Sequence, residues 1–522
     1  MSRMSARALL GLSACLFGTS LIATNPTLAQ KAKDTVRIAQ AQTIGTLDAY
    51  MDPRPEVYFL SDAVFDTLIV YDAKKKGLSP LLAKSWTRID DRTLEFELRE
   101  DVTWHDGKPF SADDVIYTIN WLNDPQTNVR FKNYYSWIEK VEKLGSHRFR
   151  LIAVKPTPFD LAMLASPNVL PIFPKHIHEA MKDKLEFGRA PIGTGPYRVV
   201  SLDINKGLSL IKRDSYPQAN DAKYAGQVRN LQVIPLPDAG TRAAAMMVGD
   251  IEMMRDVPID MAENLAGMPN LGSTVTSPIG SSYLLIDAAG RSGRKELQDV
   301  RVRRAIMMAV NSPELTQMIV GKLATGMVRQ DAMCNRAQMG CDYSVPLPDF
   351  DLAGARKLLA EAGYANGFDV EITAPSAHSG RLAEIFSGRL REIGIRAKVD
   401  TLTFAAYRDK QAKGKIELLV NGWGGGGVAD VQATLDFFFS PGPTDYFGVP
   451  RLSELAKASA AQMDDGKRRA LVREIFDTVT NIAYMTPITP QPAVWVHSKD
   501  IALIGDSTFS AWGGMAYQIG WK

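Results

Sequence analysis

The sequence predicts an α/β protein with mixed β-sheets that helices cover on their faces. Stretches with apolar residues at every second position, typical of strands, alternate with stretches whose apolar residues lie three or four positions apart, typical of helices. The 522 residues are 45% hydrophobic, which is enough to bury a large core. This length predicts two or three domains.

The first half of the chain begins with strands. Residues 36–39 and 67–70 are expected to form early strands, and apolar and charged residues alternate over 94–98. A turn follows, and Ser111, three residues before Asp114, is a good N-cap for an amphipathic helix. On its residues alone this strand–turn–helix is scaffold, because nothing in it requires catalysis.

Helices dominate the second half. Residues 299–310 carry apolar side chains at helical spacing, and Ser312 is expected to cap a second helix. Asp351 is expected to cap a third helix, and an apolar stripe over 382–393 predicts a fourth. A strand should then begin at Ile395. These stripes are interpreted as core faces, and none as a cofactor site.

The amino terminus has the features of a secretory signal peptide. Arg3 and Arg7 precede an apolar run over residues 8–23, and small residues at 27–29 offer a cleavage site. Residues 1–29 are therefore expected to be removed on export to the periplasm.

A competing signal lies inside this segment. Leu12-Ser13-Ala14-Cys15 resembles a lipobox, which would make Cys15 a lipid-anchored amino terminus. The apolar run before Cys15 is short and the apolar character continues past it, so soluble export is favoured. Later in the sequence there is no run of about 18 apolar residues, so the mature chain is not expected to span a membrane.

The charge balance bears on possible partners. The chain has 61 Lys and Arg against 58 Asp and Glu, and loss of Arg3 and Arg7 with the signal leaves 59 basic residues. A net charge of +1 gives no electrostatic footprint for nucleic acid, so no nucleic-acid partner is expected.

Only two cysteines remain in the mature chain. Cys334 and Cys341, seven residues apart in an exported protein, predict a disulfide that closes a small loop. The alternative, a metal site, lacks CxxC spacing and nearby histidines. The one close histidine pair, His176 and His178, could offer two ligands from a strand or loop but has no clear third partner, so no metal site is predicted.

Catalytic and cofactor motifs are weak in this sequence. A literal GxGxxG at 422–427 follows an expected strand at 416–420, as in a dinucleotide site. The bulky Trp423 inside that turn, and the lack of a clear βαβ unit with a ribose-binding acid, argue against nucleotide binding. No G-x-S-x-G elbow is present. One possible function is an exported hydrolase or transferase, but no catalytic residue can be assigned to it. It is kept as the alternative to the function given below.

Five short motifs, spread over the mature chain, resemble those of one protein family. They are WHDG-x-PF with DDV (104–115), GTGPY (193–197), DVRVRRAI (299–306), AGY with GF (362–368) and IGI (393–395). The family is the peptide-class periplasmic solute-binding proteins of bacterial ABC importers (family 5, of the dipeptide, oligopeptide and nickel type). The resemblance extends from about residue 36 to the last strands.

This resemblance implies a bilobal, class II-like binding protein with an extra inserted domain and a two-strand hinge. Lobe I would comprise residues 30–70, 193–282 and 492–522, the inserted domain 71–192, and lobe III 283–491. The protein would be a monomeric receptor without a cofactor that captures a solute between its lobes. It would deliver the solute to the permease subunits of an importer whose ATPase is a separate protein.

The resemblance also implies a set of ligand-binding residues in and near the glycine-rich loop. The candidates are Asn421, Trp423 and Gly424 on the loop, Asp430 beyond it, Tyr283 at a connection between lobes, and Tyr50 after the first strand. Trp423 would stack on or wall the ligand, the alternative being a core role. Asp430 would bind a cationic group, the alternative being that it caps the following helix.

One position departs from the family pattern. Peptide-binding members place an Asp three residues after the loop Trp, where it pairs with the free ammonium of the peptide, whereas this chain has Gly426. Asp430 would substitute if the loop folds back, because glycine tolerates unusual backbone angles. Otherwise the ligand would lack a free amino terminus, as in a modified peptide, an opine-like conjugate, an oligosaccharide or a metal chelate. Both classes of ligand stay open.

Overall fold

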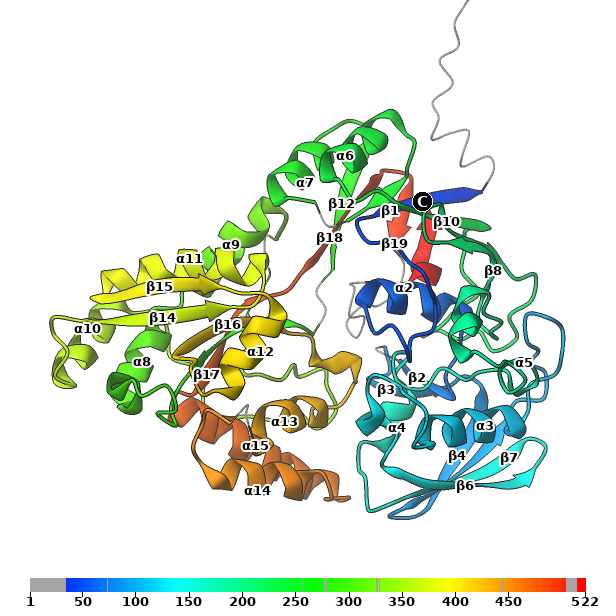
Figure 1. Ribbon diagram of the computed structural model, residues 1–522, viewed down its shortest axis with the longest axis horizontal. Helices are drawn as coiled ribbons and strands as arrows, with labels where there is room; N and C mark the ends of the chain where they lie inside the picture. Colours follow the sequence, from blue (N-terminus) through cyan, green and yellow to red (C-terminus); the bar gives the residue numbers. More distant parts are fainter. Residues whose placement is uncertain are drawn as a thin grey trace, which may run out of the picture.

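The computed structural model describes residues 34–522 except 73, 256, 277–278, 325–326, 328, 443–444 and 504–513. The expected signal peptide and Cys15 lie outside the described residues. The protein is bilobal (Figure 1). We use "large lobe" for residues 34–276 and 493–522, which hold the seven- and four-stranded sheets, and "small lobe" for residues 281–490, which hold the five-stranded sheet.

The large lobe is built around a mixed sheet of order β12-β18-β11-β1-β10-β9-β8. β1 is parallel to β10 and β11, and the other neighbours are antiparallel. Its strands come from three distant parts of the chain: β1 Thr35–Gln40, β8 Tyr197–Asp203, β9 Gly207–Lys212, β10 Asn230–Pro235, β11 Met253–Met254, β12 Leu271–Thr276 and β18 Ala493–Ser498. The strand expected at 36–39 is thus confirmed.

A four-stranded antiparallel sheet of order β4-β5-β7-β6 lies at the other end of the large lobe (Figure 1). The strand expected at 94–98 is β5, and the helix after it is α3 (Ala112–Asn123). Ser111 and Asp114 form the expected capping box. The bounds are β4 Ala83–Asp90, β5 Thr93–Leu98, β6 Ile138–Gly145 and β7 Arg148–Ala153.

Two hairpin-like pairs and several short helices complete the large lobe. The early strand expected at 67–70 begins two residues later than predicted, as β2. The elements are β2 Ile69–Asp72 with β3 Gly77–Pro80, β19 Ile501–Leu503 with β20 Ile519–Trp521, α2 Pro55–Val64, α4 Asp160–Leu164, α5 Lys175–His178, α6 Ala239–Val248, α7 Ile259–Ala266, η1 Lys132–Tyr134, η2 Lys184–Arg189 and η6 Ala516–Gln518.

The small lobe has a mixed sheet of order β15-β14-β16-β13-β17 with helices on both faces. Its strands are β13 Ser281–Ile286, β14 Phe368–Ala374, β15 Ile395–Thr401, β16 Leu418–Trp423 and β17 Met485–Pro490. Its helices are α8 Val300–Met308, α9 Ser312–Val320, α10 Leu352–Glu361, α11 Ala377–Glu392, α12 Phe404–Ala412, α13 Gln432–Phe439, α14 Pro450–Ser459, α15 Asp465–Asn481, η3 Lys295–Gln298, η4 Gly321–Ala324 and η5 Gly425–Gly427.

The side chains of β13 explain why helices cover both faces of this sheet. Successive strand residues point to opposite faces. Tyr283 and Leu285 belong to the apolar cluster under α13–α15, whereas Leu284 and Ile286 belong to the cluster under α8–α11. All six residues of β13 are buried, so the strand is apolar on both faces and needs both covers.

The helix caps were predicted with one error. Asp351 caps α10, as expected, and the structure adds Asp299 as the cap of α8. Ser312, however, is the first residue of α9, and the N-cap is Asn311, whose side chain accepts a hydrogen bond from the Glu314 amide. Asn and Ser are equally good caps, so adjacent candidates cannot be separated by residue type alone.

Two connections join the lobes. The chain passes from β12 into β13 on its way into the small lobe, and from β17 into β18 on its way back (Figure 1). The residue at which each lobe or inserted domain begins stays a prediction.

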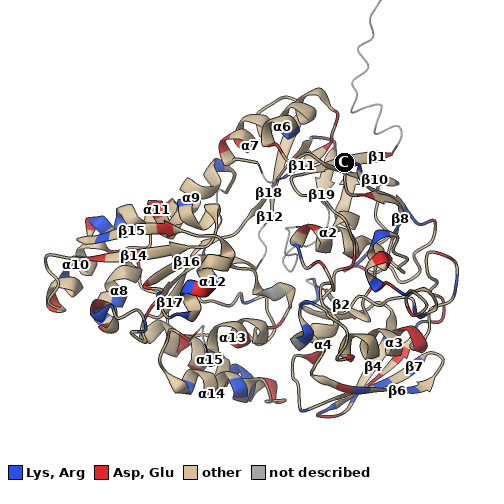
Figure 2. Ribbon diagram, in the orientation of Figure 1, with Lys and Arg blue, Asp and Glu red and all other residues tan. Residues whose placement is uncertain are grey.

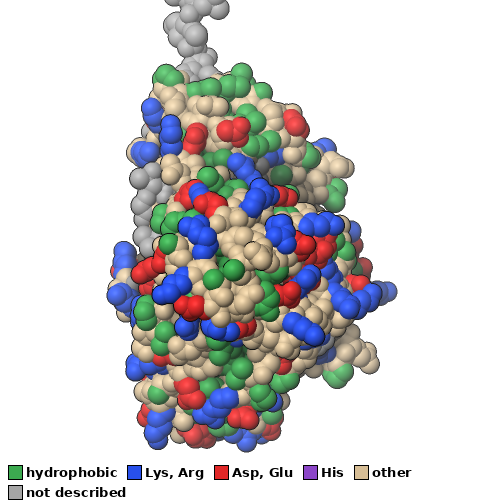
Figure 3. Space-filling model, turned by 90° about the vertical axis from the view of Figure 1, so that its left-hand side faces the viewer, with side chains coloured by type: hydrophobic (Ala, Val, Ile, Leu, Met, Phe, Trp, Pro, Cys, Tyr) green, Lys and Arg blue, Asp and Glu red, His purple; other side chains and the backbone are tan. Residues whose placement is uncertain are grey.

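Charged residues of both signs are interspersed over both lobes (Figure 2). The outer face of the small lobe likewise mixes basic, acidic and small apolar areas (Figure 3). Among the described helices, none combines the length and apolar character needed to cross a bilayer.

Candidate functional site

The glycine-rich loop of the small lobe touches the large lobe. Gly425 and Gly427 both have positive φ, +67° and +70°, so the chain turns sharply after β16. A Cβ added at Gly427 would lie 2.3 Å from Nδ2 of Asn168 in the large lobe. The Ser166 hydroxyl donates to the Gly427 carbonyl at 3.1 Å. The absence of a side chain at Gly427 is therefore what allows this close approach.

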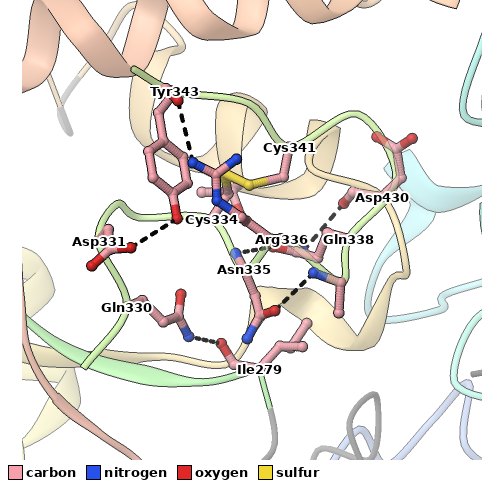
Figure 4. The surroundings of a disulfide bond; sticks show 12 residues. Ile279, Gln330, Asp331, Cys334, Asn335, Arg336, Gln338, Cys341, Tyr343 and Asp430 are labelled. Atoms are coloured by element: carbon pink, nitrogen blue, oxygen red, sulfur yellow. Dashed lines mark hydrogen bonds between the residues drawn. A yellow bond between two sulfur atoms is a disulfide. The ribbon is translucent and has the colours of Figure 1, made fainter. Parts of the chain in front are cut away.

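The predicted disulfide is confirmed, and it holds this loop in place (Figure 4). Cys334 and Cys341 are joined with their Cα atoms 5.9 Å apart. Within the loop that they close, the Met339 amide donates to the Ala429 carbonyl at 2.7 Å, and the Met339 carbonyl accepts from Val431 at 3.0 Å. The disulfide loop thus fixes the segment that continues the glycine-rich loop.

The same disulfide loop also reaches the large lobe. The Tyr71 hydroxyl, at the end of β2, donates to the Ala337 carbonyl at 3.3 Å. Tyr71 and Ser166 therefore contact two neighbouring segments of the small lobe.

A cavity of about 520 Å³ lies between the lobes at this contact. The small lobe contributes Gly427 and Ala429 to its wall. The large lobe contributes most of the remainder, including the aromatic side chains of Tyr71, Tyr224 and Tyr517. The volume and the mixture of aromatic and polar walls are typical of a small-molecule site.

A buried charge cluster forms one wall of the cavity. Lys223 lies with its Nζ 2.8 Å from Asp62 Oδ1, 2.9 Å from Asp66 Oδ1 and 2.8 Å from the Phe65 carbonyl. Both Asp62 and Lys223 line the cavity, and their side chains are only 7% and 2% exposed. Burial lowers the pKa of Lys223, but the two carboxylates outweigh it, so the net shift is upward and the ammonium stays charged.

The two carboxylates of the cluster differ. Burial raises the pKa of Asp66, but Lys223 and the hydrogen bonds from Tyr216 and Gln218 outweigh it, and its pKa falls below the ordinary value. Burial also raises the pKa of Asp62, and there Lys223 offsets it only in part. Asp66 is thus the better-satisfied carboxylate.

A family model for bacterial extracellular solute-binding proteins of family 5 matches residues 77–446. This chain belongs to that family. Family 5 proteins are non-catalytic solute receptors of the peptide and nickel importer type, so the alternative of an exported hydrolase or transferase is wrong.

Individual relatives agree with this family over nearly the whole chain. The glutathione-binding protein GsiB of Escherichia coli K12 is 25% identical over 521 residues, which cover 96% of this chain and 97% of GsiB. DppA of Helicobacter pylori in complex with the peptide STSA has a TM-score of 0.72 at 22% identity, covering 94% of this chain and 99% of DppA. NikA of Brucella suis in complex with Fe(III)-EDTA has a TM-score of 0.80 at 22% identity, covering 94% and 100%. The α/β binding-protein fold is therefore confirmed.

In this family 5 protein, three of the residues predicted to bind solute lie on β16 and the start of the glycine-rich loop. Trp423 is half-buried and stacks on Phe437 at 4.3 Å between ring centroids, and its Nε1 donates to Thr434 at 3.0 Å. The Asn421 Oδ1 accepts from the Gly422 amide at 2.8 Å. Gly424 is exposed. None of the three is among the residues that line the described cavity, and their binding roles stay predictions.

The other predicted residues are buried. Asp430 is 0% exposed; Arg468 donates to both its oxygens, at 2.6 and 2.8 Å, and Oδ1 also accepts from the Gln432 amide at the start of α13. Tyr283 packs edge-to-face on Phe438 inside the small lobe. Tyr50 lies in the core of the large lobe and donates to the Pro171 carbonyl. Asp430, Tyr283 and Tyr50 are not among the residues that line the described cavity.

The charged wall of the cavity was not predicted from the sequence. One signal was present, because Asp62 is the one charged residue in the mostly apolar buried stretch of α2 from Val57 to Val64. Its partner Lys223 is 161 residues away along the chain, and no local sequence pattern predicts this ion pair. His176 and His178, the pair considered for a metal, lie on α5 and have separate partners, Asp106 and Tyr117.

Proposed function

We propose that this protein captures a peptide or peptide-like small solute in the cavity between its lobes and delivers it to the permease subunits of an ABC importer. The observation that carries the proposal is the 520 Å³ cavity with walls from both lobes. A solute bound there contacts both lobes at once, so binding favours the closed arrangement over an open one. A permease could then distinguish loaded from empty receptor by shape.

The dimensions and chemistry of the cavity support a solute of di- or tripeptide size. Such a volume encloses a ligand of modest size, and the tyrosine rings with carboxylate and ammonium groups suit a polar solute with some apolar surface. The name of GsiB and the peptide bound to DppA point to the same class of solute.

A non-peptide solute is the second candidate, and one position favours it. Gly426 stands where peptide-binding relatives place an acid, and the carboxylate of Asp430 is already paired with Arg468. A modified peptide, an opine-like conjugate, an oligosaccharide or a metal chelate, as in the NikA complex, would not need that acid.

Native mass spectrometry of the protein purified from its own periplasm tests the proposal. We expect a retained small solute, and we expect that solute to raise the melting temperature and change tryptophan fluorescence without being converted. A protein that carries no solute and shows no shift with peptides, opines, oligosaccharides or metal chelates would contradict the receptor function.

A further inference from the structure

We propose that Asp62 is the anionic subsite of this cavity and takes the free amino group of a peptide-like solute. This inference rests on the proposed function and names the chemical class of the solute. It is carried by the geometry of one carboxylate oxygen.

The first step concerns the two oxygens of Asp62. Oδ1 accepts from Lys223 at 2.8 Å. Within the part of the chain that the structure describes, Oδ2 has no hydrogen-bond partner. It is also not fully enclosed by protein atoms, so part of its surface remains accessible. Asp62 is 6% exposed and lines the cavity, so the accessible surface of Oδ2 opens into the cavity. A buried carboxylate oxygen aimed into a cavity is an acceptor prepared for a donor.

The second step concerns the balance of charge. Two carboxylates share the single ammonium of Lys223, which donates to Asp62 and the Phe65 carbonyl and forms an ion pair with Asp66. Asp66 also accepts from the Tyr216 hydroxyl at 2.7 Å and from Gln218 and Thr194. Among the described residues, the Asp62 carboxylate accepts a hydrogen bond only from Lys223. The less satisfied negative charge of the cluster therefore lies at the cavity wall.

The third step considers the other charges near the cluster. Arg213 interacts with Asp66, but its guanidinium donates to the Thr194 carbonyl and the Thr103 hydroxyl. His105 also faces Asp66, and burial lowers its pKa to about 4, so it is neutral near pH 7. Tyr517 presents its ring to Lys223 at 5.5 Å. None of these groups neutralises Asp62.

A primary ammonium fits this environment better than a neutral donor. It supplies the positive charge that the cluster lacks, and a charge-assisted hydrogen bond to Oδ2 in a closed cavity is stronger than a neutral one. The aromatic rings of Tyr71, Tyr224 and Tyr517 then surround the remainder of the solute. The subsite thereby does what an acid at position 426 would otherwise do, from the opposite lobe.

The chain offers a matched control for this subsite. Asp160 is also buried in the large lobe, at 1% exposed, and lies outside the wall of the cavity. Its Oδ1 and Oδ2 both accept from the Arg88 guanidinium, at 2.7 and 2.9 Å. Because both its oxygens are occupied, Asp160 is a buried carboxylate without a free acceptor and away from the proposed solute.

The experiment uses two probes on the full-length exported protein. One is a defined mixture of di- and tripeptides with free amino termini, and the other is the same mixture after N-acetylation, both measured by native mass spectrometry and thermal shift. We expect wild type to bind members of the free mixture at least tenfold more tightly than their acetylated forms. We expect Asp62→Asn to lose at least tenfold in affinity for the free peptides and to lose the discrimination, while Asp160→Asn retains both.

Each alternative outcome is decisive. Equal binding of free and acetylated peptides by wild type would overturn the subsite without any variant, and would leave the receptor function standing. Asp62→Asn with wild-type affinity and an intact melting transition would do the same. Binding of neither mixture by wild type would overturn this subsite, and the search for non-peptide solutes would then decide the receptor function separately.

Discussion

Two buried acids flank the contact between the lobes, Asp62 in the large lobe and Asp430 in the small lobe, and they are used differently. Asp430 forms an ion pair with Arg468, whose guanidinium donates to both carboxylate oxygens. Asp62 shares Lys223 with Asp66, and among the described residues its Oδ2 has no hydrogen-bond partner. The comparison teaches that the ratio of carboxylates to cations decides whether a buried acid holds the fold together or remains available to a ligand.

The largest effect is expected where the pairing is complete. Arg468→Met would leave the Asp430 carboxylate buried without a cation, and we expect the free energy of unfolding of the small lobe to fall by about 3–5 kcal/mol. Urea unfolding followed by circular dichroism measures this loss, and Trp423, the only tryptophan among residues 281–490, supplies the small lobe's share of the tryptophan fluorescence. Arg469→Met is the control, because Arg469 is an exposed partner of Asp465. A loss below about 1 kcal/mol for Arg468→Met would show that the pair is dispensable.

The next effect tests the support of the small-lobe wall. Replacing Cys334 and Cys341 together by Ser removes the disulfide that closes a short loop. This should lower the free energy of unfolding by about 2–3 kcal/mol. Because that loop fixes Ala429 and contacts Tyr71, solute affinity should fall as well. Thermal unfolding and solute titration of the double variant measure both. Unchanged solute affinity would show that the disulfide loop does not support the wall of the cavity.

A smaller effect is expected at the glycine-rich loop. Gly427→Ala places a side chain at φ +70° and 2.3 Å from Asn168 Nδ2, and should lower stability by about 1–2 kcal/mol. It should also weaken solute binding, because the collision with Asn168 exists only while the lobes are in contact. The matched change Gly424→Ala, at φ −102° with no atom within 4 Å of the added Cβ, should leave stability unchanged. Equal behaviour of the two variants would count against the close approach.

The smallest change in stability is expected at Asp62 itself. Asp62→Asn removes the surplus charge and leaves Lys223 with Asp66, so the free energy of unfolding should move by less than about 1 kcal/mol. Asp430→Asn, by contrast, would leave Arg468 buried without a counter-charge and should cost about 3–5 kcal/mol. Chemical unfolding of the two variants side by side tests the comparison directly. If Asp62→Asn were the more damaging, the roles assigned to the two acids would be reversed.

The fold was more predictable from the sequence than the site, for a physical reason. Alternation over 94–98, the capping box of Ser111 and the stripe over 382–393 are local patterns, and local patterns determine local structure. The one cap assigned wrongly, at Ser312, lies beside an equally good cap. The motif resemblance then indicated the α/β binding-protein fold.

The charged wall depends on contacts that no local pattern records. Asp430 was noticed because it follows the glycine-rich loop, yet Arg468, 38 residues further along, occupies it. Asp62 was passed over because an acid on a mostly apolar helix has no visible partner in the sequence. Its availability depends on Lys223 and on the competing claim of Asp66, and only the folded chain brings these three together.

The central claim, that a solute is held in the cavity between the lobes, is tested most directly by filling that cavity. Ala222 lines it, and Ala222→Trp would place a bulky ring where the solute is proposed to lie. Native mass spectrometry of wild type and Ala222→Trp, both purified from the periplasm, compares what each retains. We expect solute on the wild type and none on a folded Ala222→Trp protein. The same solute retained at wild-type level by the variant would contradict the account.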